Sequence, residues 1–136
     1  MRVIIFGSGT GTNFQAILNE VYNGKLNIKI EALVCNKSNA PIIDKAKNKN
    51  IPVIIEPYSS KRITREEYYS ILKEKIVPYS PDLIILAGWM LIITPEFLRC
   101  FPNMINLHPA LPGKFAGKDG IGDAYRAFQK RKIQYK

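Results

Sequence analysis

The chain has 136 residues, enough for one domain that buries about two thirds of the surface its unfolded form would expose. Its 46% hydrophobic and 23% charged residues are typical of a globular protein and exclude a disordered one. The net charge of +9 favours anionic ligands in general, but the lysine-rich stretches lack interleaved aromatic residues, so we do not expect nucleic-acid binding.

No apolar run reaches the roughly 18 residues of a membrane span, and the N-terminus has no signal-peptide pattern. We therefore expect a cytoplasmic protein without a membrane partner. Cys35 and Cys100 match no metal-ligand spacing, so we predict two reduced thiols and no metal site.

The first element is a short apolar run at 2–7, RVIIFG, which predicts a strand buried on both faces. A glycine turn, GSGTGTN, follows it, and apolar residues then recur at helical spacing over 14–24. The glycines match neither the dinucleotide-binding pattern nor a P-loop. What remains is a phosphate-sized anion site at the start of the helix, formed by Gly11, Thr12 and Asn13. The alternative is a tight turn that needs glycine and binds nothing.

The alternation of strand and helix continues along the chain. Further strands are predicted at 28–35, 52–57, 81–89 and 104–108, and further helices at 40–49, after Thr64, at 94–101 and at 122–132. Thr64 stands three residues before Glu67, the spacing of a capping box, and the helix that follows is predicted to bury Tyr68, Ile71, Leu72 and Ile76. Thr94 and Pro95 predict the start of the next helix.

This order predicts a doubly wound α/β fold, with a mostly parallel sheet and helices on both faces. Ligands of such folds bind at the carboxyl ends of the strands. Three segments are predicted to lie there: 7–13, 88–93 and 106–117.

The third of these segments contains the chain's one histidine, His108, two residues after Asn106. Residues two apart in a strand project to the same side, so both side chains are predicted to point past the strand end together. An imidazole that exchanges protons near pH 7 and an amide that donates to an oxyanion suit acyl transfer. The alternative is a histidine with a surface or packing role.

Three stretches of the chain carry a family pattern: MRVIIFGSGTGTNFQAIL at 1–18, PDLIILAGWMLII at 81–93 and NLHPALPGKFAG at 106–117. Together they resemble the phosphoribosylglycinamide formyltransferase family of purine biosynthesis. Methionyl-tRNA formyltransferase and formyltetrahydrofolate deformylase share an Asn-x-His core. The GxGTN turn and the proline after His108 favour the glycinamide ribonucleotide enzymes.

The resemblance implies that a formyl group passes directly from the cosubstrate 10-formyltetrahydrofolate to the amine of glycinamide ribonucleotide, without a metal. It implies that Gly11, Thr12 and Asn13 hold the substrate phosphate, and that Asn106 and His108 are the catalytic pair that stabilises the oxyanion. It also implies a pterin pocket lined by Met90, Leu91, Ile92 and Ile93, with Arg65 beside it. The implied partners are therefore small molecules.

The sequence departs from the family pattern in two places. The family usually reads His-Pro-Ser-Leu-Leu-Pro, whereas this chain has Ala110, Pro112 and Gly113, a variant of the fungal-type branch. The family's third catalytic residue, an aspartate in an Asp-x-Gly loop well beyond the histidine, has no counterpart, because Asp119 and Asp123 come too early.

We therefore expect residues 1–136 to form a single domain that is incomplete at its C-terminus and lacks the family's last strands and C-terminal helix. Loss of a residue that orients a catalytic histidine costs orders of magnitude in rate, so this chain as it stands is expected to bind weakly and turn over slowly. The alternative function is a nucleotide- or phosphometabolite-binding α/β domain without catalysis.

Overall fold

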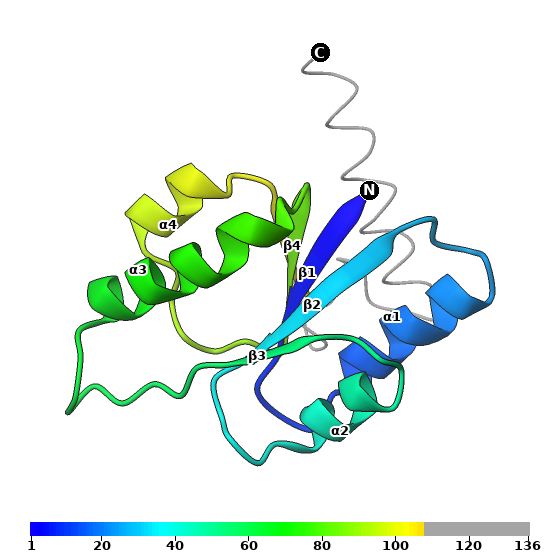
Figure 1. Ribbon diagram of the computed structural model, residues 1–136, viewed down its shortest axis with the longest axis horizontal. Helices are drawn as coiled ribbons and strands as arrows, with labels where there is room; N and C mark the ends of the chain where they lie inside the picture. Colours follow the sequence, from blue (N-terminus) through cyan, green and yellow to red (C-terminus); the bar gives the residue numbers. More distant parts are fainter. Residues whose placement is uncertain (108–136) are drawn as a thin grey trace.

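The structure, a computed structural model, describes residues 1–107, which form five strands and four α-helices in alternation (Figure 1). The strands are β1 (Arg2–Phe6), β2 (Lys29–Cys35), β3 (Val53–Ile55), β4 (Leu83–Ala87) and β5 (Met104–Leu107). The helices are α1 (Thr12–Tyr22), α2 (Pro41–Lys47), α3 (Arg65–Ile76) and α4 (Pro95–Cys100), with a short 3-10 helix, η1 (Val77–Tyr79), after α3.

The strands of the described residues pair in the order β3-β2-β1-β4-β5, and every pairing is parallel. The predicted doubly wound fold is therefore confirmed. The predicted helix at 122–132 lies outside the described residues.

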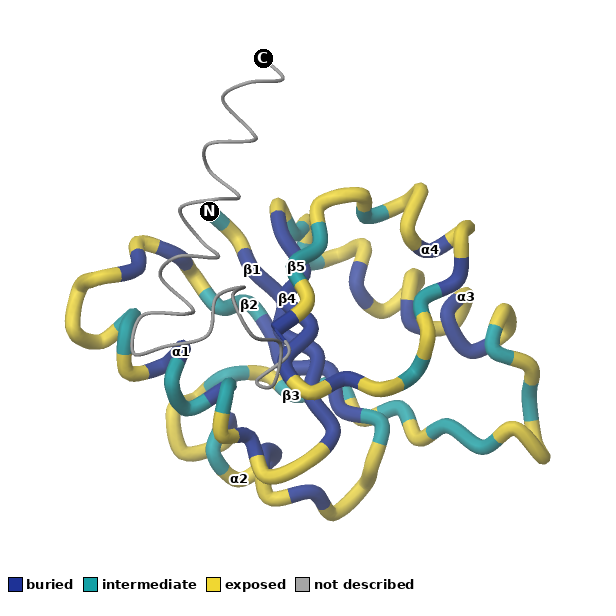
Figure 2. Tube along the Cα trace, turned by 180° about the vertical axis from the view of Figure 1, so that it is seen from behind, coloured by how far each residue is buried: buried dark blue, intermediate teal, exposed yellow. Residues whose placement is uncertain are grey.

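Helices cover both faces of the sheet, and each face has its own core. Side chains of β1 alternate between the faces, so that Val3 and Ile5 pack with α1 and α2 while Ile4 and Phe6 pack with α3 and α4. Figure 2 shows the resulting layers, with buried strands at the centre and exposed residues on the outer sides of the helices. The apolar run of β1, which has no polar alternation, is explained by burial on both faces.

The buried face of α3 differs from the prediction at one position. Tyr68, Leu72 and Ile76 are buried as predicted, but Ile71 is 38% exposed and Tyr69 is buried in its place. The reason is that α3 packs beside α4, where the rings of Tyr69 and Phe97 lie 4.9 Å apart between their centroids. The buried face of α3 is therefore turned toward α4.

Both predicted helix starts are confirmed. The backbone N–H of Glu67 donates to the Thr64 hydroxyl over 3.1 Å, and the backbone N–H of Thr64 donates to the Glu67 carboxylate over 3.3 Å, which completes a capping box. Thr94 accepts from the backbone N–H of Phe97 over 3.3 Å, with Pro95 as the first residue of α4. These caps fix where the loops before α3 and α4 end.

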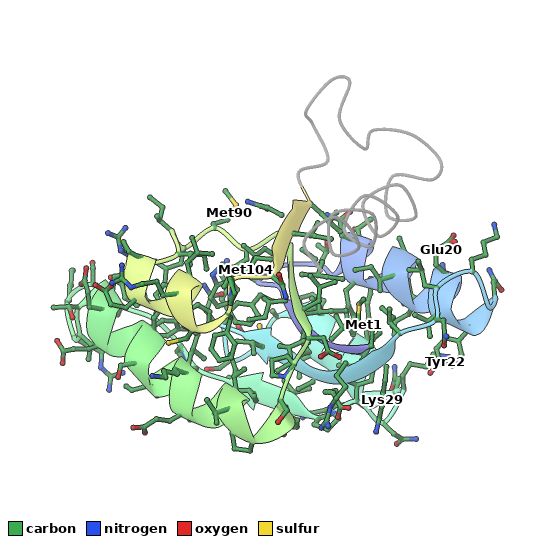
Figure 3. All side chains as sticks on the ribbon, turned by 90° about the horizontal axis from the view of Figure 1, so that it is seen from above. Met1, Glu20, Tyr22, Lys29, Met90 and Met104 are labelled. Carbon is green, nitrogen blue, oxygen red and sulfur yellow. The ribbon has the colours of Figure 1, made fainter. Side chains whose placement is uncertain are left out.

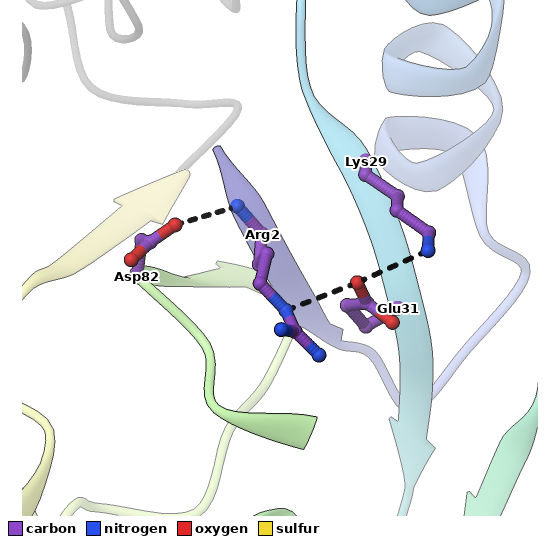
Figure 4. A network of polar contacts seen from close by, with 4 residues as sticks. All are labelled: Arg2, Lys29, Glu31 and Asp82. Atoms are coloured by element: carbon purple, nitrogen blue, oxygen red, sulfur yellow. Dashed lines mark hydrogen bonds and ion pairs between the residues drawn. The ribbon is translucent and has the colours of Figure 1, made fainter.

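A polar network joins three strands at the amino-terminal end of the sheet (Figure 4). The backbone N–H of Arg2 donates to the Asp82 carboxylate over 2.8 Å, and its guanidinium lies 3.2 Å from the Glu31 carboxylate, which also pairs with Lys29 over 3.6 Å. Because the carboxyl ends of the strands lie at the opposite edge, this network has a structural role and leaves that edge free for a site.

Residues 1–107 contain no helix long and apolar enough to cross a membrane.

Candidate functional site

The segments that follow β1 and β4 come together with β5 at one edge of the sheet. Phe6 at the end of β1 pairs with Leu86 of β4, and Leu86 pairs in turn with Asn106 of β5. The segments that begin at Gly7 and Gly88 therefore leave neighbouring strands at the same end of the sheet, and Asn106 lies on the strand at the other side of β4. The predicted gathering of these segments is present as far as the structure describes them.

The turn between β1 and α1 depends on two glycines that touch Ile42 of α2. Gly11 is the N-cap of α1 with a φ of 83°, and a Cβ added there would lie 2.9 Å from the Ile42 Cγ1. A Cβ on Gly7 would meet the Ile42 Cδ1 and lie 3.2 Å from the carbonyl oxygen of Ala87. Glycine is thus required at Gly11, and a side chain at Gly7 would have to displace the end of the Ile42 side chain and crowd the Ala87 carbonyl.

The first turn of α1 begins at Thr12 and Asn13, the two side chains predicted to hold an anion with Gly11. No side chain among residues 1–107 caps this helix start, and no acidic residue lies in its first turn. The hydroxyls of Thr10 and Thr12 lie 3.1 Å apart. The backbone N–H groups of a helix's first turn and the positive end of its dipole favour an anion at such a place.

The segment after β4 is held by bonds from two other parts of the fold. Gly88 has a φ of 77°, and its carbonyl accepts a hydrogen bond from the buried Ser8 hydroxyl over 3.1 Å. From the other side, the Tyr69 hydroxyl donates to the carbonyl of Leu91 over 2.7 Å and accepts from the Trp89 indole N–H over 3.0 Å. The backbone of 88–91 is therefore fixed at both ends.

The residues predicted to line the pterin pocket divide into two pairs. Met90 is 82% and Ile92 69% exposed, whereas Leu91 and Ile93 are partly buried against the core beneath α3 and α4. Figure 3 shows Met90 at the outer surface of the molecule. The exposed pair presents apolar side chains at the surface, and the half-buried pair packs the segment against the core.

Arg65, the remaining residue of the predicted folate site, is the first residue of α3. Its Nε is buried and has no hydrogen-bond partner among the described residues. Its charge lies close enough to Tyr69 to act on the pKa of that phenol. Arg65 thus lies near Tyr69, whose hydroxyl bonds to the carbonyl of Leu91.

Burial raises the pKa of the Tyr69 phenol from its ordinary 10.0 to about 12, partly opposed by the Trp89 hydrogen bond and the Arg65 charge. Burial also raises the pKa of Tyr68, and the charges of Tyr69 and Glu56 add to this effect.

These pKa values predict a loss of stability in alkali. Above pH 10 the unfolded chain releases tyrosine protons that the folded chain retains, so the free energy of unfolding falls as the pH rises from 10 toward 12. Urea unfolding at pH 9 and pH 11 measures this loss, which we expect to be smaller in Tyr69→Phe and Tyr68→Phe. An equal loss in both variants and the unmodified chain would contradict the assignment.

Of the predicted catalytic pair, the structure describes Asn106 and not His108, which lies outside the described residues. Asn106 is exposed on β5, on the same face of the sheet as Met104, which packs against the core beneath α3 and α4. Its amide therefore lies on the face that carries Arg65 and Tyr69.

Two other features contain none of the predicted site residues. A cavity of about 340 Å³ opens between α3 and α4, with Tyr69, Lys73, Phe97 and Cys100 among its lining residues. Cys35 is buried and Cys100 exposed, and both thiols are free. Within residues 1–107, no group of three or more histidine, cysteine, aspartate or glutamate residues is placed to hold a metal.

Sequence reasoning missed Ser8, Tyr69 and Trp89, which shape the segment after β4. For Tyr69 a signal was present, because it stands three and seven residues before Leu72 and Ile76 and so belongs to the same helical stripe. Ser8 had no such signal, since its partner Gly88 is 80 residues away in the sequence.

Comparison with known proteins agrees with this geometry. The profile of the formyl transferase family matches residues 1–132. Phosphoribosylglycinamide formyltransferase from Schizosaccharomyces pombe is 36% identical over 145 residues, covering 98% of this chain and 70% of that protein. The enzyme of the same name from Dictyostelium discoideum is 35% identical and is covered to 71% of its length.

The fold also matches solved structures of this group. Glycinamide ribonucleotide transformylase 1 from Geobacillus kaustophilus superimposes with a TM-score of 0.75 at 35% identity, over 93% of this chain and 67% of that one. The family match covers almost the whole chain, and the relatives agree in sequence and fold. This chain belongs to the formyl transferase family, among the phosphoribosylglycinamide formyltransferases.

Proposed function

We propose that this chain transfers a formyl group from 10-formyltetrahydrofolate to the amine of glycinamide ribonucleotide, a step of purine biosynthesis. We expect slow turnover of residues 1–136, because the aspartate of the family's Asp-x-Gly loop has no counterpart in them. The observation that carries the proposal is the meeting of the 7–13 turn, the 88–93 segment and Asn106 at one edge of the sheet, in a chain of this family. In this proposal residues 1–136 form a single domain that carries the site. We also propose that the protein is located in the cytoplasm.

The substrate phosphate binds, in this proposal, at the start of α1. The N-cap Gly11 brings no side chain, so an anion can approach the N–H groups of the first turn closely, and Thr12 and Asn13 add a hydroxyl and an amide. The first turn contains no acidic residue and is capped by no side chain that the structure describes, which supports this role.

The folate binds along the 88–93 segment. Met90 and Ile92 offer exposed apolar side chains to a flat heterocycle, while Leu91 and Ile93 contribute to the pocket from the protein side. Arg65 supplies a cation near Tyr69, and its buried Nε, which has no partner within residues 1–107, supports a role in binding an acidic ligand. A folate has a flat aromatic ring system, whose faces can pack on apolar side chains, and carboxylates that can pair with a cation.

Asn106 and His108 act on the reacting formyl group. The substrate amine attacks the formyl carbon, a C–N bond forms, and the carbonyl oxygen becomes an oxyanion that the Asn106 amide and the His108 imidazole stabilise. When the tetrahedral intermediate collapses, the bond to the folate nitrogen breaks and that nitrogen receives the proton lost by the amine. No covalent bond to the protein and no metal is required.

Calorimetric titration separates this function from phosphometabolite binding without catalysis. The chain is titrated with glycinamide ribonucleotide and with 10-formyl-5,8-dideazafolate, a stable analogue of the cosubstrate. We expect both to bind, Asn13→Ala to weaken only the nucleotide, and Arg65→Ala to weaken only the folate, each about tenfold, the value of one hydrogen bond to a charged group.

The matched control is Arg62→Ala, which removes an exposed arginine three residues before Arg65. It is expected to leave both affinities unchanged. Nucleotide binding without any response to the folate analogue would favour the non-catalytic alternative.

A further inference from the structure

The Tyr69 hydroxyl joins two nearby residues of the segment after β4. It accepts a hydrogen bond from the indole N–H of Trp89 over 3.0 Å and donates one to the backbone carbonyl of Leu91 over 2.7 Å. Both distances are those of well-formed hydrogen bonds. One side chain of α3 thus closes a ring across residues 89–91.

Tyr69 is itself held in a fixed position. Its side chain is 1% exposed, and its ring packs against Phe97 of α4 and Tyr68 of α3, with centroids 4.9 and 5.6 Å away. Trp89 is fixed in turn, because its ring meets Phe6 of β1 edge-on at 4.9 Å. The hydroxyl therefore connects the segment to two helices and the central strand.

This connection determines which side chains of the segment face outward. The Trp89 side chain points into the core and is 4% exposed, and the carbonyl of Leu91 accepts a hydrogen bond from Tyr69 of α3. Met90, which lies between them, is left 82% exposed, and Ile92 on the other side of Leu91 is 69% exposed. The two bonds to Tyr69 thus hold residues on either side of Met90 in an arrangement in which inward and outward side chains alternate.

We propose that Tyr69 is a positioning residue for folate binding, which holds the 88–93 segment in the shape that presents Met90 and Ile92 to the ligand. The inference rests on the proposed function, since it assigns this segment to the folate. Tyr69 acts through Trp89 and Leu91 and does not touch the reacting atoms. Its loss should therefore affect the folate and leave the nucleotide, which binds at α1, unaffected.

Tyr69→Phe tests the proposal, because it removes the hydroxyl and keeps the ring that packs against Phe97. Tyr68→Phe is the matched control: Tyr68 is the adjacent, equally buried residue of α3, but its hydroxyl donates to the carbonyl of Glu56, away from the segment. Amide hydrogen exchange of the peptide covering 88–93 and calorimetric affinity for 10-formyl-5,8-dideazafolate are measured in both variants of the full chain.

In Tyr69→Phe we expect faster exchange in the 88–93 peptide and a folate affinity about tenfold lower, with unchanged affinity for glycinamide ribonucleotide. Tyr68→Phe should leave all three quantities unchanged, even where its melting temperature falls. Equal exchange and equal folate affinity in Tyr69→Phe and the unmodified chain would overturn the proposal. So would an equal loss of both affinities, which indicates general destabilisation.

Two further measurements keep the result decisive. If Tyr69→Phe does not fold, Trp89→Phe removes one of the two bonds and should give a smaller change of the same kind, and no change would overturn the proposal. If the unmodified chain does not bind the folate analogue, the proposed function fails, whereas the exchange comparison still decides whether Tyr69 holds the segment.

Discussion

Replacing Asn106 with alanine is expected to lower kcat for formyl transfer about 100- to 1000-fold, the usual cost of removing one donor to an oxyanion. Asn106 is exposed on β5 and pairs in register with Leu86, two residues before Gly88, so its amide lies next to the segment assigned to the folate. The substitution removes no buried contact, and the melting temperature should stay the same. The rate is followed by the absorbance of the deformylated folate.

Asn103→Ala is the matched control for this experiment. Asn103 lies three residues earlier, where its amide donates to the carbonyl of Asp82 over 3.3 Å, before the start of β4. The control should retain full activity, and His108→Ala should lose activity to a similar extent as Asn106→Ala. Full activity in Asn106→Ala would remove this residue from the catalytic pair.

Replacing Gly11 with alanine is expected to lower the free energy of unfolding by about 2–4 kcal/mol, through a left-handed backbone and a steric clash together. Its φ is 83°, and the new Cβ would lie 3.1 Å from the Ile42 Cβ and 3.2 Å from its Cα, which belongs to the backbone and cannot swing away. Urea unfolding measures the effect. Nucleotide affinity should fall as well, since Gly11 begins the proposed phosphate site.

Two other glycines separate the two causes. Gly24 has a φ of 74° and open space around it, so Gly24→Ala tests backbone strain alone and should cost about 1–2 kcal/mol. Gly9 has no atom within 4 Å of an added Cβ, and Gly9→Ala should range from no change to about 1 kcal/mol of stabilisation. A Gly11→Ala variant no less stable than Gly24→Ala would show that the contact with Ile42 is unimportant.

Much of the fold could be predicted, because the apolar patterns and the helix-capping residues of the sequence indicate the same strands and helices. The apolar run of β1 predicts a central strand, and the Thr64–Glu67 spacing predicts a capping box that the hydrogen bonds confirm. The edge strand was predicted less well: it was expected over 52–57 and is observed over Val53–Ile55. Pro52 and Pro57 cannot donate ladder hydrogen bonds, which shortens the regular part of an edge strand.

The site could be predicted only in part. The strand ends identify the three segments, because neighbouring parallel strands carry their following loops to one edge. The division of the pterin-pocket residues into exposed Met90 and Ile92 and half-buried Leu91 and Ile93 could not be predicted, since it depends on Tyr69, about 20 residues earlier in the sequence and on another layer. The prediction for His108 stays a prediction.

The most direct test of this account is formyl transfer itself, measured in the protein as its gene encodes it. With 10-formyltetrahydrofolate present, we predict release of deformylated folate that depends on glycinamide ribonucleotide, is lost in Asn106→Ala and persists in Asn103→Ala. Folate release that is absent, or that proceeds equally without the nucleotide, would contradict the proposed function.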